Sequence, residues 1–94
     1  MPSYIYILAS KMAGTLYIGV TSDLVKRISE HKNGIKANFT SRYSVHRLVY
    51  FEQFDDIETA ILREKQLKKY NRLKKINLIE SENPSWFDIF ERII

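Results

Sequence analysis

The chain of 94 residues has room for one domain with a modest core, and we expect residues 1–94 to form it. It has no cysteine, which excludes disulfides, thiolate catalysis and cysteine-ligated zinc. Its 15 Lys and Arg residues outnumber its 11 Asp and Glu residues, and the net charge of +4 suggests an anionic partner. No apolar run approaches the roughly 20 residues of a membrane span and no signal peptide opens the chain, so we expect a cytoplasmic protein without membrane contact.

Two alternating segments at the start of the chain predict a β-hairpin. Residues 4–9 read Y-I-Y-I-L-A and residues 15–20 read T-L-Y-I-G-V, with a turn-like stretch between them. The first segment is apolar on both faces, which is typical of a strand buried on both sides. Gly19 in the second segment indicates that a backbone, a side chain or a ligand comes close at that point.

A short amphipathic helix and a third strand follow. Thr21 and Ser22 are suitable N-cap residues before Asp23, so we predict that the helix begins there. Residues 34–44 are polar and basic without a period, and we expect a surface loop. Residues 46–54 then predict the third strand.

The second half of the chain predicts three helices. Asp55 and Glu58 resemble a capping box that begins the first of them. A helix over residues 72–81 follows the capping residue Asn71. Residues 83–94 start with Asn-Pro and repeat apolar side chains at helical spacing, which predicts a C-terminal helical tail. This order, ββαβααα, predicts an α+β fold with a small, mostly antiparallel, three-stranded sheet flanked by helices.

Glu64 is the acidic residue whose position is hardest to interpret as that of an ordinary solvent-exposed side chain. It falls at helical spacing from Ala60 and Ile61, so the predicted helix turns it toward the core. A buried carboxylate needs a partner or a metal ion. Lys68, one turn further on, is a suitable partner, or Glu64 lies at the edge of the apolar stripe. In the functional interpretation it holds Mg²⁺, which binds one or two carboxylates together with waters and phosphate oxygens.

Two further pairs have both a structural and a chemical interpretation. Arg27 and His31 lie one helical turn apart. In the chemical interpretation Arg27 holds a phosphate and His31 accepts a proton. In the structural interpretation Arg27 is simply solvated and His31 lies near the C-terminal end of the helix. Tyr6 and Tyr17 lie on adjacent predicted strands. In the chemical interpretation one of the two phenols acts as a base or orients a water molecule. In the structural interpretation both side chains simply pack. Glycine-rich phosphate loops, Ser-His-Asp sets, paired acidic metal motifs and two-histidine metal spacings are absent.

These features follow one another in a particular order along the chain. Tyr4-Ile5-Tyr6 is followed, after a gap of ten residues, by Tyr17-Ile18-Gly19 and then by Arg27, His31 and Glu64. The ordered set resembles the GIY-YIG endonuclease superfamily, in particular its short stand-alone members, and the likeness extends over almost the whole chain. The first glycine of that family's first motif is a tyrosine here, at a position that we interpret as structural.

The resemblance implies a ββαβα nuclease core that hydrolyses DNA phosphodiesters with one divalent ion, Mg²⁺ or Mn²⁺. It leaves open which tyrosine activates the attacking water. Asn71 and Asn77 are candidates for a supporting asparagine of the family, although neither spacing fits clearly. The resemblance assigns metal binding, phosphate binding and the handling of water to five residues: Glu64 for the metal, Arg27 for the phosphate, and Tyr6, Tyr17 and His31 for the water.

Basic residues are concentrated between positions 63 and 75, where seven of them are opposed by Glu64 alone. So short a chain leads us to expect weak or structure-based DNA specificity in a repair or recombination role. A non-catalytic nucleic-acid-binding module of the same fold stays open as an alternative. So does an interaction module that forms a homodimer or binds a larger protein through Trp86, Phe90 and Ile93. The residues that we expect to bind DNA are Lys36, Arg42, Lys65, Lys68, Lys69, Arg72 and Lys75.

Overall fold

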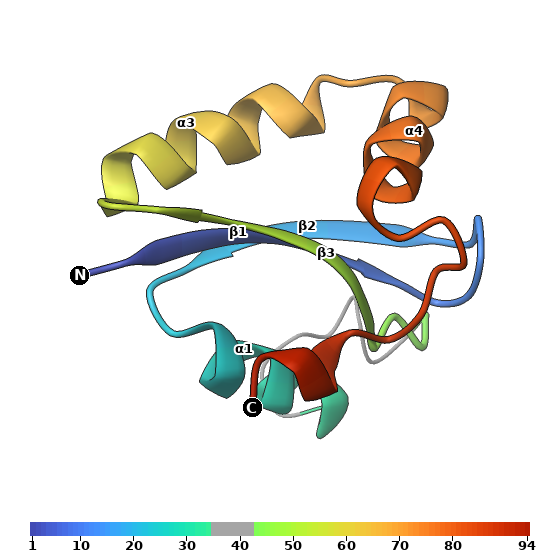
Figure 1. Cartoon of the computed structure of the whole chain (residues 1–94), viewed down its shortest axis with the longest axis horizontal. Helices are drawn as coiled ribbons and strands as arrows, with labels where there is room; N and C mark the ends of the chain where they lie inside the picture. Colours follow the sequence, from blue (N-terminus) through green and yellow to red (C-terminus); the bar gives the residue numbers. More distant parts are fainter. Residues whose placement is uncertain (35–42) are drawn as a thin grey trace.

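Three antiparallel strands lie at the centre of the computed structural model, which describes residues 1–34 and 43–94 (Figure 1). β1 (Ser3–Ala9) pairs with β2 (Leu16–Thr21) on one side and with β3 (Arg47–Phe54) on the other. The predicted α+β class and its ββαβα core are therefore confirmed. The helices of the described residues are α1 (Leu24–Lys32), α3 (Ile57–Lys68) and α4 (Arg72–Glu82), followed by the 3₁₀ turn η1 (Phe90–Arg92).

The helices cover both faces of the sheet (Figure 1). α3 and α4 lie on one side, and α1 lies on the other together with the C-terminal segment. Ile5 and Ile7 of β1 point into the core under α3 and α4, whereas Tyr6 and Leu8 point into the core beside α1. β1 is buried on both sides, as predicted, because it is the middle strand.

Two of the predicted helix starts are wrong by one or two residues. α1 begins after Asp23, since the hydroxyl of Thr21 accepts a hydrogen bond from the Asp23 N–H and does not reach the helix. α3 begins after Asp56 and not after Asp55. In both helices the capping carboxylate accepts a hydrogen bond from the N–H three residues further on, which is the geometry that an N-cap requires. Asn71 caps α4 as predicted.

The C-terminal tail is not the helix predicted over residues 83–94. Asn83 ends α4, because its backbone N–H donates to the carbonyl oxygen of Ile79 at 2.8 Å. Its side-chain amide donates to the carbonyl oxygen of Val49 at 3.0 Å and so ties the tail to β3. Trp86 has a φ of 57°, which an α-helix does not accommodate. The tail runs along β3 in an irregular path, and η1 is its only helical turn.

Candidate active site

The hydroxyl of Tyr6 occupies the space above Gly19. The two residues lie directly opposite each other in the β1–β2 ladder, so their side-chain positions share one face of the sheet. A Cβ atom on Gly19 would lie 2.9 Å from Cε1 of Tyr6 and closer still to its Cζ and hydroxyl oxygen. The close approach predicted at Gly19 is confirmed, and the approaching group is the Tyr6 side chain.

His31 meets Tyr6 from the other side. α1 packs Leu24 and Ile28 against the sheet, which turns His31, one turn after Ile28, toward the same core. The hydroxyl oxygen of Tyr6 lies 2.9 Å from Nε2 of His31, and both side chains are almost completely buried. Tyr17 completes the cluster, with its ring centroid 5.3 Å from that of His31 and 6.3 Å from that of Tyr6.

Burial keeps both partners of this hydrogen bond neutral. It raises the pKa of Tyr6 far above its usual range, and the neighbouring Tyr17 raises it further. Burial also lowers the pKa of His31, and the positive charge of Arg27 acts in the same direction. At neutral pH the phenol is therefore protonated and the imidazole is uncharged, which suits a hydrogen bond from the Tyr6 hydroxyl to Nε2 of His31.

Arg27 lies beside this pair at the surface. Its charge and its hydrogen bonding oppose the rise in the pKa of Tyr6. Nε of Arg27 lies 3.4 Å from Oε1 of Glu30, one turn further along α1, and 41% of the Arg27 side chain is exposed. The sequence interpretation missed Glu30, although its i,i+3 spacing from Arg27 is a signal for such a pair. The guanidinium is thus oriented by Glu30 while it remains accessible to a phosphate.

Glu64 belongs to α3, which packs on the other face of the sheet (Figure 1). Its negative charge contributes to the raised pKa of Tyr6, so Glu64 acts on the cluster electrostatically. Its side chain is 16% exposed, and its Oε2 lies 3.6 Å from Nζ of Lys68, which is more than half exposed. The ion pair with Lys68, which the sequence left as one of two structural alternatives, is present.

Glu64 is the one proposed carboxylate that would hold a metal ion at this site. Within residues 1–34 and 43–94, no group of three or more His, Cys, Asp and Glu side chains is placed to enclose a metal ion. Mg²⁺ does not need such a group, because waters and substrate phosphate oxygens supply its remaining ligands. Glu64 is partly accessible and its ion pair with Lys68 is long, so its carboxylate is able to accept a metal ion.

A shallow groove of about 370 Å³ runs beside Tyr17. Its floor is formed by residues 16–18 of β2, and two basic side chains, Lys68 of α3 and Lys75 of α4, line it as well. Phosphates of a nucleic acid strand would meet positive charge there. The groove adjoins the cluster because Tyr17 belongs to both.

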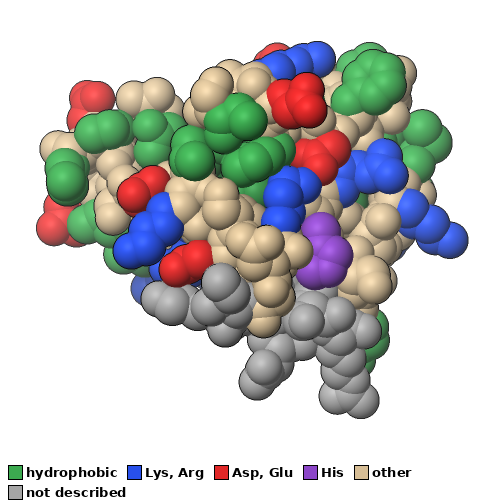
Figure 2. All heavy atoms as spheres, turned by 90° about the horizontal axis from the view of Figure 1, so that it is seen from below, with side chains coloured by type: hydrophobic (Ala, Val, Ile, Leu, Met, Phe, Trp, Pro, Cys, Tyr) green, Lys and Arg blue, Asp and Glu red, His purple; other side chains and the backbone are tan. Residues whose placement is uncertain are grey.

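The other basic residues proposed for DNA binding have different surroundings. Lys65 and Lys69 are exposed, whereas the guanidinium of Arg72 donates to the backbone carbonyl oxygens of Ala13 and Gly14 and ties α4 to the hairpin turn. On the face seen in Figure 2, basic and acidic side chains are interspersed and do not form one positive surface. Two further candidates, Lys36 and Arg42, lie outside the described residues.

Neither candidate asparagine hydrogen-bonds to the cluster in the part of the chain that the structure describes. The side chain of Asn71 accepts a hydrogen bond from the Lys74 N–H and caps α4. Asn77 lies on the exposed side of α4. Their role as supporting residues stays a prediction.

The predicted protein-docking face is partly wrong. Trp86 is completely buried, and its indole N–H donates to Oε2 of Glu80 at 2.7 Å, so it is not available to a partner. Phe90 and Ile93 are partly buried against the core beside α1. None of the described helices is both long and apolar enough to cross a membrane.

Comparison with known proteins identifies close relatives. The model of the GIY-YIG catalytic domain matches residues 2–77. A UPF0213 protein of Staphylococcus saprophyticus is 43% identical over 76 residues, which cover 81% of this chain and 92% of the relative. One of Clostridium perfringens is 42% identical over 81 residues, 86% of each chain. The structure is also similar to the solution NMR structure of the UPF0213 protein BH0048 from Bacillus halodurans, with a TM-score of 0.58 and 32% sequence identity. The matched region covers 94% of this chain and 93% of that one.

Proposed function

Because this chain belongs to the GIY-YIG family, we propose that it is a DNA endonuclease that hydrolyses phosphodiester bonds with one divalent ion, Mg²⁺ or Mn²⁺. The observation that carries the proposal is a cluster of side chains from β1, β2 and α1: the phenol of Tyr6 with its hydroxyl beside the neutral imidazole of His31, the second phenol of Tyr17, and the accessible guanidinium of Arg27. The carboxylate of Glu64, on α3, adds a negative charge that acts on Tyr6.

Each of these residues has a role that its surroundings support. Glu64 would hold the metal ion, which when bound polarises the phosphoryl group and offsets its charge. Arg27 would bind a phosphate oxygen, with its orientation maintained by Glu30. A water molecule attacking the phosphorus would transfer its proton to the Tyr6 hydroxyl while that hydroxyl gives its own proton to Nε2 of His31. This relay suits the lowered pKa of His31, since only the neutral imidazole is able to accept the proton.

A second candidate function follows from the ion pair of Glu64. Lys68 satisfies the carboxylate without a metal ion, so the same fold would also serve as a non-catalytic module that binds nucleic acid through Lys68 and Lys75. Such a module would bind DNA without cutting it, and its binding would weaken with added salt.

Cleavage assays on the purified chain separate the two functions. Plain, nicked and branched duplex DNA are incubated with Mg²⁺, Mn²⁺ or EDTA, which also tests the predicted structure-based specificity. We expect metal-dependent cutting that falls about 100-fold or more in Glu64→Gln and in Arg27→Ala, since each change removes charge stabilisation at the phosphate. Binding of Mn²⁺, followed by electron paramagnetic resonance, is expected to be lost only in Glu64→Gln.

Two neighbouring substitutions serve as matched controls. Glu58→Gln removes an exposed carboxylate from the first turn of α3, and Lys26→Ala removes an exposed cation next to Arg27 on α1. Both are expected to cut DNA at the unmodified rate. Cutting that survives Glu64→Gln would disprove the metal site. Tight, salt-sensitive binding with no cutting of any substrate would establish the non-catalytic module instead.

A further inference from the structure

The outer edge of β3 is only partly covered. β3 is an edge strand, and the C-terminal tail lies beside its first residues. The N–H of Leu48 donates to Oδ1 of Asp88 at 3.2 Å, and the carbonyl oxygen of Leu48 accepts from the N–H of Ile89 at 2.8 Å. The side chain of Asn83 donates to the next carbonyl oxygen, that of Val49. The tail therefore occupies the position of a fourth strand, but only beside residues 48 and 49.

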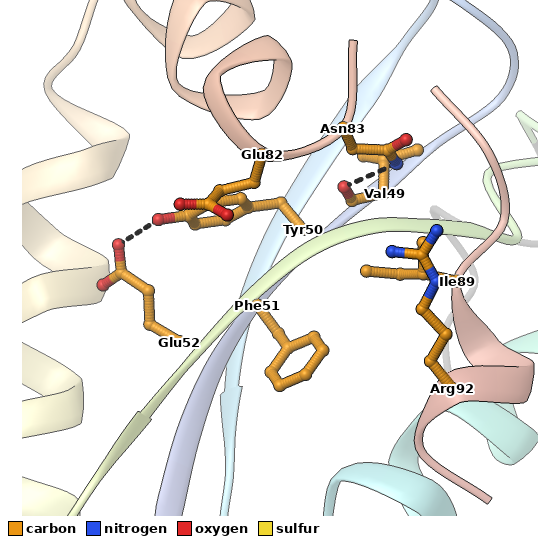
Figure 3. A pocket seen from close by; sticks show the side chains of 8 residues that line it. All are labelled: Val49, Tyr50, Phe51, Glu52, Glu82, Asn83, Ile89 and Arg92. Atoms are coloured by element: carbon orange, nitrogen blue, oxygen red, sulfur yellow. Dashed lines mark hydrogen bonds between the residues drawn. The ribbon is translucent and has the colours of Figure 1, made fainter. Parts of the chain in front are cut away.

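From Tyr50 onward this fourth-strand position is open. The tail turns away into η1, and no other element of the described residues pairs with the outer edge of residues 50–54. Every second residue of an antiparallel edge strand points its N–H and C=O outward, so this stretch presents backbone groups that an added strand would pair with. A cavity of about 430 Å³ lies here (Figure 3), lined by Val49, Tyr50, Phe51, Glu52, Glu82, Asn83, Ile89 and Arg92.

One wall of this β3-edge groove is apolar. Phe51 points to the α1 side of the sheet, away from Tyr50, and Ile89 lies on the same side (Figure 3). Phe51 also lines an adjoining hollow of about 320 Å³ together with Val25 and Ile93. An added strand would bury apolar side chains on this wall.

The opposite wall is acidic. Glu82 is the last residue of α4, it is exposed, and it lies over Tyr50 (Figure 3). The last turn of α4 has no basic residue, so the negative end of the helix dipole adds to the Glu82 charge. No hydrogen bond or ion pair of Glu82 is found among the described residues, in contrast to Glu52, which is held by Arg63. The groove thus has an unneutralised carboxylate in a protein whose net charge is +4. Arg92 contributes a positive charge at its far end.

We propose that the β3-edge groove binds an extended segment of a partner protein, which adds a fourth strand beside residues 50–54. Alternate side chains of that segment are apolar and pack on Phe51, which is partly exposed, and a lysine or arginine between them pairs with Glu82. A second copy of this chain is the alternative occupant, which the test below distinguishes.

The groove and the candidate active site lie at opposite edges of the sheet. Tyr17 and Gly19 are on β2, the groove is on β3, and β1 separates them. A bound segment would therefore leave Glu64 and Arg27 accessible. The partner would bring this chain to a larger assembly without blocking its substrate.

A peptide titration tests the proposal on the full chain, labelled with ¹⁵N for NMR. The probe is a six-residue peptide of alternating valine and lysine with blocked ends. We expect shifts confined to residues 50–54, Glu82, Ile89 and Arg92, and at least a tenfold weaker affinity in Glu82→Lys. Glu58→Lys makes the same charge change at an exposed position of α3, away from the groove, and is expected to bind the probe with unchanged affinity. The same peptide with proline in place of valine is expected not to bind, since proline has no N–H and does not fit within a paired strand.

Three outcomes would overturn the proposal. They are an absence of shifts at millimolar probe, shifts that are unchanged in Glu82→Lys, and equal binding of a valine–glutamate peptide. Self-association in sedimentation, with the same shifts appearing on concentration alone, would assign the groove to a second copy. DNA cleavage is measured separately with and without the probe, so failure of the proposed nuclease function leaves this test intact.

Discussion

The missing side chain at Gly19 makes room for the Tyr6 hydroxyl, and through it for the hydrogen bond to His31. Tyr6 is completely buried, and its ring packs against those of Tyr17 and His31. At this position a glycine is needed for side-chain space, since only Gly34 among the glycines has a positive φ. One residue without a side chain therefore makes room for the Tyr6 hydroxyl beside His31.

Gly19→Ala is expected to destabilise the protein by about 1–3 kcal/mol, because the new methyl group overlaps the Tyr6 ring. Urea unfolding measures the change. In a Tyr6→Val background the same substitution is expected to have little effect, since the overlapping ring is gone. A similar loss of stability in both backgrounds would show that the strain at Gly19 has another origin.

At the scale of elements, a network of polar side chains anchors α3 to β3. Nε and Nη2 of Arg63 donate to the two carboxylate oxygens of Glu52 at 2.8 and 2.9 Å, and the Tyr50 hydroxyl donates to the same carboxylate. Arg63 also contacts Tyr70, whose ring lies under Nζ of Lys74. The network joins α3 to β3, next to Glu64 in the chain.

Arg63→Met is expected to cost about 1–3 kcal/mol at neutral pH, because Glu52 loses a two-point, partly buried ion pair. Burial alone would raise the pKa of Glu52, but the hydrogen bonds from Arg63 and Tyr50 and the charge of Arg63 lower it below its usual 4.5. The stability that this shift provides is present above pH 4.5 and is lost as the pH falls through the lowered pKa of Glu52.

Urea unfolding at pH 7 and pH 3 therefore measures the free energy of unfolding of the unmodified protein and of Arg63→Met. The difference in this free energy between the two proteins is expected to be smaller at pH 3 than at pH 7. Lys65→Met, an exposed change on the same helix, is expected to remain within about 0.5 kcal/mol of the unmodified protein. A difference that is independent of pH would mean that Arg63 acts by packing alone.

At the scale of the whole molecule, the C-terminal tail completes the fold. The family model ends at residue 77, yet Trp86 is inserted completely into the core under α4, with Ile5, Ile7 and Val49 among the residues of the same cluster. Nζ of Lys32 lies 2.5 Å from Oδ2 of Asp88 and ties the tail to α1. The tail thus links both layers and forms one end of the β3-edge groove.

Trp86→Ala is expected to destabilise the protein by about 3–5 kcal/mol, because it leaves a large cavity and removes the hydrogen bond to Glu80. Phe87→Ala is the matched control, since Phe87 is the next aromatic side chain and is 61% exposed. We expect its effect to be within about 0.5 kcal/mol. Thermal unfolding measures the stability of both variants. An equal loss of stability in Trp86→Ala and Phe87→Ala would show that the burial of Trp86 contributes little.

The elements and most of their bounds were predictable, because the signals for them are local. Alternation identified the strands, and the burial of β1 on both faces followed from its apolar residues. Capping was predictable only to within one or two residues, because Thr21, Ser22 and Asp23, and likewise Asp55 and Asp56, are neighbouring residues of types that cap helices, and only the structure shows which side chain reaches a helix N–H. The tail was mispredicted because Trp86 and Ile89 have helical spacing although the chain between them is irregular.

The sequence by itself determined the fold class and the chemical identity of the candidate site residues, because periodicity and residue type depend only on the local chain. The tertiary structure decided what those residues meet. The Tyr6 hydroxyl reaches His31 only because α1 packs beside β1, and Glu64 acts on Tyr6 only because α3 spans the other face. The path of the tail and the open edge of β3 likewise depend on contacts between segments far apart in the chain, which no local pattern specifies.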